Sequence, residues 1–327
     1  MVFTRGQAAR CFGRRYVDAQ IRAGDWVLLY RGVYTTKEKW AATDAAHRCM
    51  LAGLARCVTT SGDTVVSHES AAGVLSIPLL RRMTGPPRIT VHTPGSTTAG
   101  GIGGRYLAPV PREHRIFVRG VPITSAPRTV ADLCRTDDMR SATVVADAAL
   151  RLGVSRDHVL EVLAFCRRWP YAAAARETMR WASRWSESPL ESLALRWCRL
   201  QGLPLPEQQL TIRSDAGRFL ARVDFVWPEL RTVAEVDGQV KYLDDADDPE
   251  QAKRADRVHW KEKLREDGLR DHGIEVARGY WSDVPDDGAR FAQRVRRAFA
   301  RAASYTGTPT YRIVDGRDHA RRGRLAA

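Results

Sequence analysis

The sequence RVDFVWPELRTVAEVDG, residues 222–238, decides the fold of the C-terminal part of this chain. Its central PELR is a typical four-residue connection between antiparallel strands, so the segment predicts a β-hairpin. If Trp227 pairs with Thr232 across that connection, Asp224 lies directly opposite Glu235 on the neighbouring strand. Because successive side chains of a strand point to alternate faces, both carboxylates then share one face of the sheet.

Two carboxylates placed opposite each other need a compensating charge. Opposed side chains have Cβ atoms about 4.5–5.5 Å apart, and like charges at that distance destabilise a sheet. A hard divalent cation, Mg²⁺ or Mn²⁺, neutralises such a pair, activates water and stabilises the leaving oxygen of a phosphodiester. Asp224 and Glu235 are therefore predicted metal ligands and catalytic residues. Asp237 is a candidate third ligand, and its alternative role is an ion pair with Arg222, which the same register places opposite it.

The segments around the hairpin predict an α/β domain with the element order αβββαβα. Ser188 opens a helix that ends near Leu200, and Glu191 completes a capping box with it. In a second role, which the first does not exclude, Glu191 is a further metal and catalytic ligand beside the hairpin. The arginines of the last two helices, Arg265 among them, either follow a DNA backbone or form a solvated face. The other expected elements are strands 209–213, 219–227, 232–237 and 273–278, a helix from about 249 to 271, and a basic helix ending at Ala303.

The first 38 residues predict a winged helix. A capping box of Thr4 and Gln7 opens one helix, a second helix follows over residues 14–23, and residues 26–34 form a tight hairpin. In this plan the second helix enters the major groove of DNA. The alternative is a small protein-contact module whose arginines are only solvated. The cations expected to contact DNA are Arg14, Arg15, Arg22 and Arg31.

The composition of the chain narrows the range of possible functions further. The chain has 327 residues and carries 52 Lys and Arg against 38 Asp and Glu, a formal net charge of +14. This surplus favours a polyanionic partner, of which DNA is the default, and the length predicts two or three domains. No apolar run is long enough to span a membrane and the N-terminus lacks a secretory signal, so a cytoplasmic protein is expected. The six cysteines are scattered without metal-ligand spacing, which argues against structural zinc.

We expect four segments along the chain. Residues 1–38 form the winged helix, residues 39–185 form a mixed α+β region whose second half is helical, residues 186–304 form the α/β domain, and residues 305–327 form a mobile basic tail. The shorter elements expected in the second segment are strands at 88–92, 115–118 and 121–124 and a glycine-rich loop at 96–104.

The C-terminal motifs resemble a nuclease family. The sequences S-x-x-E, R-V-D-F-x-W-P-E and A-E-V-D-G-Q-V-K-Y, which lie within residues 186–300, are similar to the DUF559 branch of the PD-(D/E)XK superfamily. That branch is related to the very-short-patch repair endonucleases. The resemblance implies a restriction-endonuclease-like fold, with Asp224 as the central acidic residue, Glu235 as its partner and Glu191 as the helix glutamate.

One position departs from the (D/E)-x-K pattern of the superfamily. Two residues after Glu235 this chain has Asp237, where the pattern has lysine. The nearest substitute for this catalytic cation is Lys241. Lys261 and Lys263, on the following helix, are the alternatives.

The N-terminal motifs resemble AbiEi-type antitoxins. The sequence FTRGQAARCFGRRYVDAQIRAGDWVLLYRGVY looks like their winged helix, and GVPITSAPRTVADL, residues 120–133, is similar to their following domain. The resemblance implies binding to operator DNA and repression of a toxin–antitoxin operon. It also implies a cognate toxin or a second copy of the chain as a protein partner.

Three functions follow from these observations. The first is a Mg²⁺-dependent DNA endonuclease that its winged helix brings to the target, and the paired carboxylates favour it, because a domain kept only for binding has no reason to retain their repulsion. The second is a repressor that binds DNA without cutting it, and the missing lysine and the antitoxin-like N-terminus favour it. The third is a protein-interaction module whose charge is incidental. We expect the nuclease.

Overall fold

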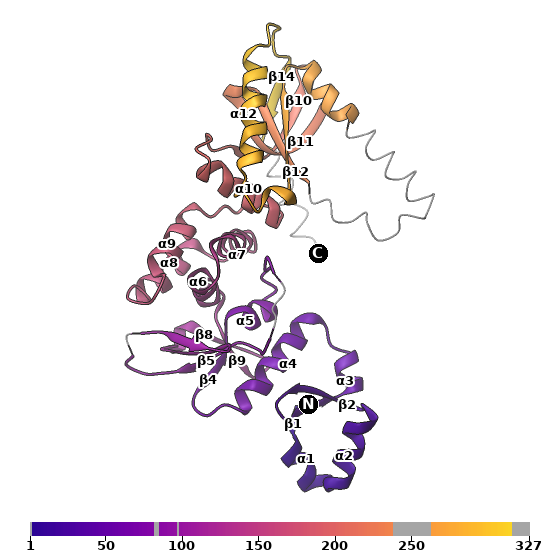
Figure 1. The fold of residues 1–327 in the computed structure, drawn as a ribbon, viewed down its shortest axis with the longest axis vertical. Helices are drawn as coiled ribbons and strands as arrows, with labels where there is room; N and C mark the ends of the chain where they lie inside the picture. The colour runs from indigo at the N-terminus through magenta and orange to yellow at the C-terminus, as the bar shows by residue number, and fades with distance from the viewer. Residues whose placement is uncertain (1, 82–84, 97, 238–262, 316–327) are drawn as a thin grey trace. The chain divides into compact units, whose positions relative to one another are not determined.

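The computed structural model describes residues 2–81, 85–96, 98–237 and 263–315. These residues form a mixed α/β structure with three separate β-sheets, and the chain divides into two compact units, Met1–Arg184 and Trp185–Ala327 (Figure 1). Each unit has a buried apolar core of its own. Within the described ranges, no helix is long and apolar enough to cross a membrane.

The N-terminal module combines two helices with a small sheet whose strand order is β1-β3-β2. The predicted capping box is confirmed: Thr4 Oγ1 accepts the Gln7 N–H at 3.1 Å, and Gln7 Oε1 accepts the Thr4 N–H at 2.8 Å. Gly24 ends the second helix in the left-handed region, at φ 73°. The elements are β1 (Phe3–Thr4), α1 (Arg5–Phe12), α2 (Arg14–Ala23), β2 (Trp26–Tyr30) and β3 (Val33–Thr36).

The next part of unit 1 is a six-stranded mixed sheet of order β6-β7-β5-β4-β9-β8. The predicted strands near residues 88–92, 115–118 and 121–124 are confirmed. The strands are β4 (Thr64–Val66), β5 (Ile89–His92), β6 (Gly100–Ile102), β7 (Arg105–Ala108), β8 (Arg115–Val118) and β9 (Val121–Thr124). The helices are α3 (Lys37–Ala41), α4 (Ala45–Val58), α5 (His68–Val74) and the 3-10 turn η1 (Arg112–His114).

The expectation of a loop at residues 96–104 is wrong, because β6 lies inside it. β6 pairs with β7 across Gly103 and Gly104, whose φ angles of 56° and 75° make the tight turn. Glycine has no side chain to display an alternating pattern, so this edge strand carries no sequence signal.

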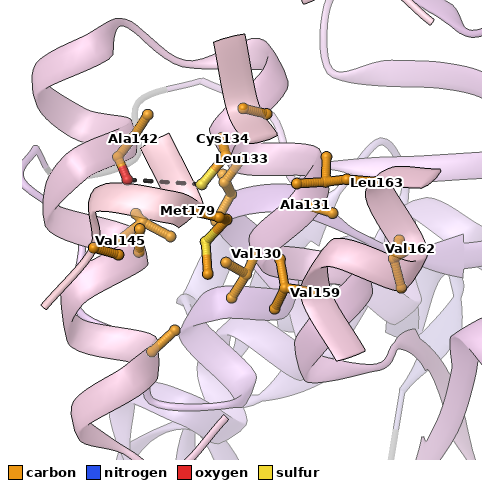
Figure 2. Packing of buried hydrophobic residues seen from close by; sticks show 14 of the residues in the cluster. Val130, Ala131, Leu133, Cys134, Ala142, Val145, Val159, Val162, Leu163 and Met179 are labelled. Atoms are coloured by element: carbon orange, nitrogen blue, oxygen red, sulfur yellow. Dashed lines mark hydrogen bonds between the residues drawn. The ribbon is translucent and has the colours of Figure 1, made fainter. Parts of the chain in front are cut away.

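A helical bundle completes unit 1. It contains α6 (Ala126–Thr136), α7 (Met139–Arg151), α8 (Arg156–Phe165) and α9 (Ala172–Trp181). Figure 2 shows the apolar face of α6, with Val130, Leu133 and Cys134 packed among side chains of the other three helices. The Cys134 thiol donates to the Ala142 carbonyl at 3.7 Å. The opposite face of α6 is polar, and its residues Arg128, Asp132 and Arg135 line a cavity within unit 1.

Unit 2 is built around a five-stranded sheet of order β13-β12-β11-β10-β14. The predicted register of the hairpin is confirmed, since Trp227 pairs with Thr232 and Phe225 with Ala234. Both hairpin faces are buried near the turn, and Trp227 packs on Phe299 of α12 with ring centroids 5.3 Å apart. The strands are β10 (Glu207–Ser214), β11 (Phe219–Trp227), β12 (Thr232–Asp237), β13 (Glu275–Tyr280) and β14 (Tyr311–Val314). The helical elements are α10 (Pro189–Leu200), the 3-10 turns η2 (Pro228–Leu230) and η3 (Trp281–Asp283), α12 (Ala289–Ala303), and residues 263–271.

Two expectations for unit 2 are wrong. The segment after residue 305 is not only a tail, because β14 pairs with β10 and places Tyr311 and Ile313 against the core. Strand β13 begins two residues later than residue 273, because Gly273, at φ 83°, still belongs to the turn that ends the preceding helix. The first part of the helix expected from about residue 249 lies outside the described residues.

Candidate functional site

Glu191 is buried at the beginning of α10, where only 6% of its surface is exposed. Ser188 caps the helix as predicted, since its Oγ accepts the Glu191 N–H at 3.2 Å. The Glu191 carboxylate, however, accepts the N–H of Glu187 at 2.8 Å and not the N–H of Ser188, so the reciprocal half of the expected capping box is wrong by one residue. The same carboxylate oxygen also accepts the side-chain amide of Gln209 at 2.7 Å. The Glu191 carboxylate therefore binds the backbone that precedes α10 and also contacts Gln209 of β10.

Asp224 lies where the β11–β12 ladder ends. The ladder runs to Phe225 and Ala234, and one step further the Asp224 carboxylate accepts the backbone N–H of Val236 at 2.9 Å. Val236 directly follows Glu235 in β12, so this bond agrees with the predicted register. The other Asp224 oxygen accepts the Gln209 amide at 3.3 Å.

Gln209 joins Glu191 to Asp224, and the sequence did not identify it. Its amide nitrogen donates to both carboxylates, its surface is 3% exposed, and its backbone is in the left-handed region at φ 57°. Left-handed backbone in a non-glycine residue is strained, and such strain concentrates at functional sites. The one available signal was a Gln-Gln pair at the beginning of an expected strand, but the irregular pairing of β10 with β11 could not be predicted from the turn between them.

The carboxyl groups of Glu191, which is buried, and of Asp224, which is half-buried, both have raised pKa values. Burial raises the pKa of Glu191 and the nearby charge of Asp224 raises it further. Burial also raises the pKa of Asp224, although the Val236 N–H and the Gln209 amide partly offset that effect. Both groups thus bind a proton more tightly in the folded protein than in the unfolded chain, and a cation placed between them would relieve the same repulsion.

We expect these raised pKa values to make unit 2 less stable as the pH rises. Between the ordinary carboxyl pKa and the raised folded values, the folded state holds more protons than the unfolded state, so the free energy of unfolding falls with increasing pH. Urea unfolding measured between pH 4 and pH 8 should therefore show a smaller decline for Glu191→Gln/Asp224→Asn than for the wild type. The control is Glu229→Gln, an exposed carboxylate in η2, which should follow the wild type. Equal declines in all three proteins would contradict the assignment.

Glu235 is compensated by arginine. Its Oε2 accepts from Arg265 Nη2 at 2.6 Å, and Arg278 Nη2 lies 4.0 Å away, on the β13 residue that pairs with Glu235. Arg278 also contacts Glu266 at 3.4 Å. The compensating charge that the sequence predicts is thus supplied at Glu235 by guanidinium groups, and a divalent cation at this carboxylate stays a prediction.

The other predicted site residues have different environments. Arg222 binds Glu187 through two contacts of 2.8 and 3.1 Å, so the suggested ion pair with Asp237 is wrong. Asp237 instead pairs along the backbone with Tyr280 of β13. Lys263 is exposed at the beginning of its helical segment. Lys241 and Lys261 lie outside the described residues.

The donor set of this site suits a hard cation in part. Glu191, Asp224 and Glu235 offer carboxylate oxygens, and Gln209 carries an amide oxygen besides the nitrogen that now donates, which is the chemistry that Mg²⁺ prefers. Over residues 2–81, 85–96, 98–237 and 263–315, no three His, Cys, Asp or Glu side chains are already arranged to hold a metal ion. A metal would thus have to replace the Gln209 N–H and Arg265 contacts.

The predicted DNA contacts are all exposed in the N-terminal module. Arg14, Arg15 and Arg22 lie along α2, and Arg31 lies in the turn between β2 and β3. Arg22 donates to the Asp18 carbonyl at 3.2 Å, and Arg31 lies over the ring of Tyr30 with its guanidinium carbon 5.7 Å from the centroid. These local contacts leave the positive charge of the guanidinium groups at the surface.

Comparisons with known proteins find relatives that are described as uncharacterized. No known family model matches the chain. Over 300 residues, 88% of this chain, it is 28% identical to two proteins of which 98% is covered. They are the uncharacterized protein MT2308 of Mycobacterium tuberculosis strain CDC 1551 / Oshkosh and the uncharacterized protein Rv2248 of strain ATCC 25618 / H37Rv. The chain is thus similar to these mycobacterial proteins over nearly their whole length.

Proposed function

We propose that this protein is a cytoplasmic DNA-binding protein whose unit 2 is a Mg²⁺- or Mn²⁺-dependent DNA endonuclease with a restriction-endonuclease-like fold. The carrying observation is that Gln209 joins Glu191 of α10 to Asp224 of β11 where the β11–β12 ladder ends, and that Asp224 binds the backbone N–H of Val236, the residue after Glu235. Glu191 is buried and Asp224 is half-buried around one amide, and their raised pKa values mean that their charge costs stability. A domain retains such costly carboxylates when they serve a function.

Each residue of the site has a role in this proposal. Asp224, Glu235 and Glu191 would hold the ion, which when bound supplies an activated water and stabilises the leaving oxygen. Gln209 fixes the relative orientation of Glu191 and Asp224. Arg265 supplies positive charge beside Glu235, in place of the lysine that the superfamily pattern has at position 237, and can stabilise charge that develops on the phosphoryl oxygens. Lys241 remains a second candidate for that role.

The test is cleavage of supercoiled plasmid and short duplexes by the full chain in Mg²⁺ or Mn²⁺, with DNA binding recorded in EDTA. Metal-dependent nicking or linearisation supports the proposal. Binding without cutting overturns it in favour of the second function below. If the protein neither binds nor cuts, both functions are wrong.

The second candidate function is a repressor of the AbiEi type that binds operator DNA without cutting it. The observation that favours it is the contact of Arg265 with Glu235, because an arginine-bound carboxylate needs no metal. In this function a cognate toxin or a second copy of the chain would be the protein partner.

Both functions require the arginines of α2 to contact phosphates. We therefore expect Arg14→Ala/Arg15→Ala to weaken DNA binding for all sequences and to reduce the slope of log Kobs against log salt by about 0.9 for each phosphate that the variant no longer neutralises. The matched control is Arg167→Ala/Arg168→Ala, an exposed adjacent pair of unit 1 that follows α8. Fluorescence anisotropy at several salt concentrations measures both. A smaller slope in the control pair and not in the α2 pair would place the DNA contacts elsewhere.

A further inference from the structure

An open cavity with polar and apolar lining residues lies within unit 1 and has no role in the proposed function. It has a volume of about 260 Å³ and is lined by residues at strands β5 to β7, the beginning of α5, the polar face of α6 and the residues before α9. On α6, Arg128, Asp132 and Arg135 follow each other at helical spacing and line the cavity, whereas the apolar face of the same helix packs into the bundle (Figure 2). Arg128 and Asp132 belong to the motif GVPITSAPRTVADL, which the nuclease site does not use.

Three buried donors around this cavity have no acceptor in the described part of the chain. They are Nη2 of Arg128, Nε of Arg135 and Nε2 of His68. The exposed fractions of these side chains are 0%, 5% and 2%. Buried donors of this kind are rare in folded proteins and are costly when they stay unpaired.

The other nitrogens of the two guanidinium groups each have an acceptor, which fixes these groups in place. Arg128 donates to Asp132 at 2.8 Å and to the Pro109 carbonyl at 3.0 Å. Arg135 donates to the Pro170 carbonyl at 2.8 Å, and both guanidinium groups lie over the ring of Trp169 at 5.0 and 4.9 Å from its centroid. The donors without acceptors are thus held in position before any ligand arrives.

The net charge of the residues that line the cavity favours a ligand with one negative charge. Two arginines face one carboxylate, Asp132, which leaves a net charge of +1. Burial lowers the pKa of His68 to about 4, so its imidazole is neutral near pH 7. Thr90 donates to Ser67 Oγ, and the Ser67 hydroxyl can donate in turn to His68 Nδ1, 2.9 Å away. In that arrangement the proton of the neutral ring is on Nε2, which is then a third donor.

The backbone is strained where it contributes to the cavity. His68 has φ 50° and Tyr171 has φ 61°, and both residues line the cavity. The His68 ring stacks on Tyr106 at a centroid distance of 3.6 Å and an angle of 13°. Strained residues that are held by surrounding packing are typical of ligand sites.

We propose that this cavity binds a small organic monocarboxylate. The carboxylate accepts from Arg128, Arg135 and His68, and it balances the single positive charge of the wall. The body of the molecule lies against Tyr106 and the small residues around it. Carboxylates suit this set because they are acceptors only and bind guanidinium groups strongly.

The test titrates the full chain with acetate, benzoate and nicotinate, each beside its neutral carboxamide, by calorimetry and thermal unfolding. We expect at least one carboxylate to bind at least tenfold more tightly than its amide and to raise the Tm by a few degrees at ten times its Kd. Carboxylate and amide that bind equally, or no binding of any carboxylate, would overturn the proposal. Tighter binding of inorganic phosphate than of all three carboxylates would also overturn it.

Two variants locate the binding. Gly100→Phe places a large side chain at the rim of the cavity, because Gly100 lines it, is exposed, and a Cβ at this position meets no atom within 4 Å. His68→Asn removes the third donor and keeps a residue that tolerates a left-handed backbone. Each should weaken carboxylate binding at least tenfold, while Gly6→Phe in α1, also uncrowded, should not. Unchanged binding in both cavity variants would show that the ligand binds elsewhere.

Discussion

Asp224→Asn should reduce metal-dependent DNA cleavage by about 10³-fold or more, while DNA binding in EDTA stays within about twofold of the wild type. Asparagine has nearly the same shape and keeps an oxygen for the Val236 N–H, so the end of the β11–β12 ladder is preserved. What it removes is the negative charge that a metal ion requires. Single-turnover cleavage of a labelled duplex, with protein in excess, measures the loss without interference from product release.

Glu229→Gln is the matched control for this substitution. It removes the same charge from the same hairpin, but at an exposed turn position remote from the ladder end. Cleavage should therefore remain at the wild-type rate. If Asp224→Asn cuts as well as Glu229→Gln does, Asp224 is not a metal ligand and the nuclease assignment of unit 2 is wrong.

The stability of the two variants separates a catalytic loss from an unfolded protein. Because burial raises the pKa of Asp224, its ionised form costs stability at neutral pH, and asparagine removes that cost. The free energy of unfolding of Asp224→Asn should thus equal or exceed that of the wild type. A variant that is inactive but at least as stable as the wild type has lost its catalytic activity and has kept its fold.

The hairpin could be predicted because its information is local. A four-residue turn and the alternation on both sides of it fix the register, so the neighbourhood of Asp224 and Glu235 followed from seventeen consecutive letters, residues 222–238. The partners of these carboxylates could not be predicted in the same way. Arg265 is thirty residues from Glu235 along the chain, and its contact depends on how a helix packs on the sheet.

Backbone irregularity hid the remaining features. Gln209 reaches both carboxylates through a left-handed conformation that no propensity for glutamine indicates. Strand β6 contains two glycines, and β14 is a four-residue edge strand, so neither has an apolar alternation long enough to be recognised. The cavity in unit 1 was also invisible, because its three donors come from the start of α5 and the polar face of α6.

Asp132→Asn should destabilise unit 1 by about 3–5 kcal/mol, the largest effect on stability that we expect from a single substitution. The carboxylate is 1% exposed and contacts Arg128 at 2.8 Å and Arg135 at 3.5 Å. Burial alone would raise the pKa of Asp132, but the Arg128 charge and its neighbours outweigh burial and hold that pKa below its usual range. Asparagine would leave two buried guanidinium groups without a counter-charge. Denaturant unfolding, followed by circular dichroism, measures the loss.

Asp137→Asn, five residues further along the chain, is a control that should change the free energy of unfolding in the opposite direction or leave it unchanged. Burial, together with the charge of Glu69, raises the pKa of Asp137 to about 6, so its charge opposes folding at pH 7. Neutralising it should leave the free energy of unfolding unchanged or raise it, whereas neutralising Asp132 lowers it. Equal effects of the two substitutions would mean that Asp132 is not the counter-ion of the arginines.

The Asp132→Asn variant also tests the cavity in unit 1. With Asp132 neutral, the cavity wall carries two uncompensated positive charges, so an added carboxylate should stabilise Asp132→Asn more than it stabilises the wild type.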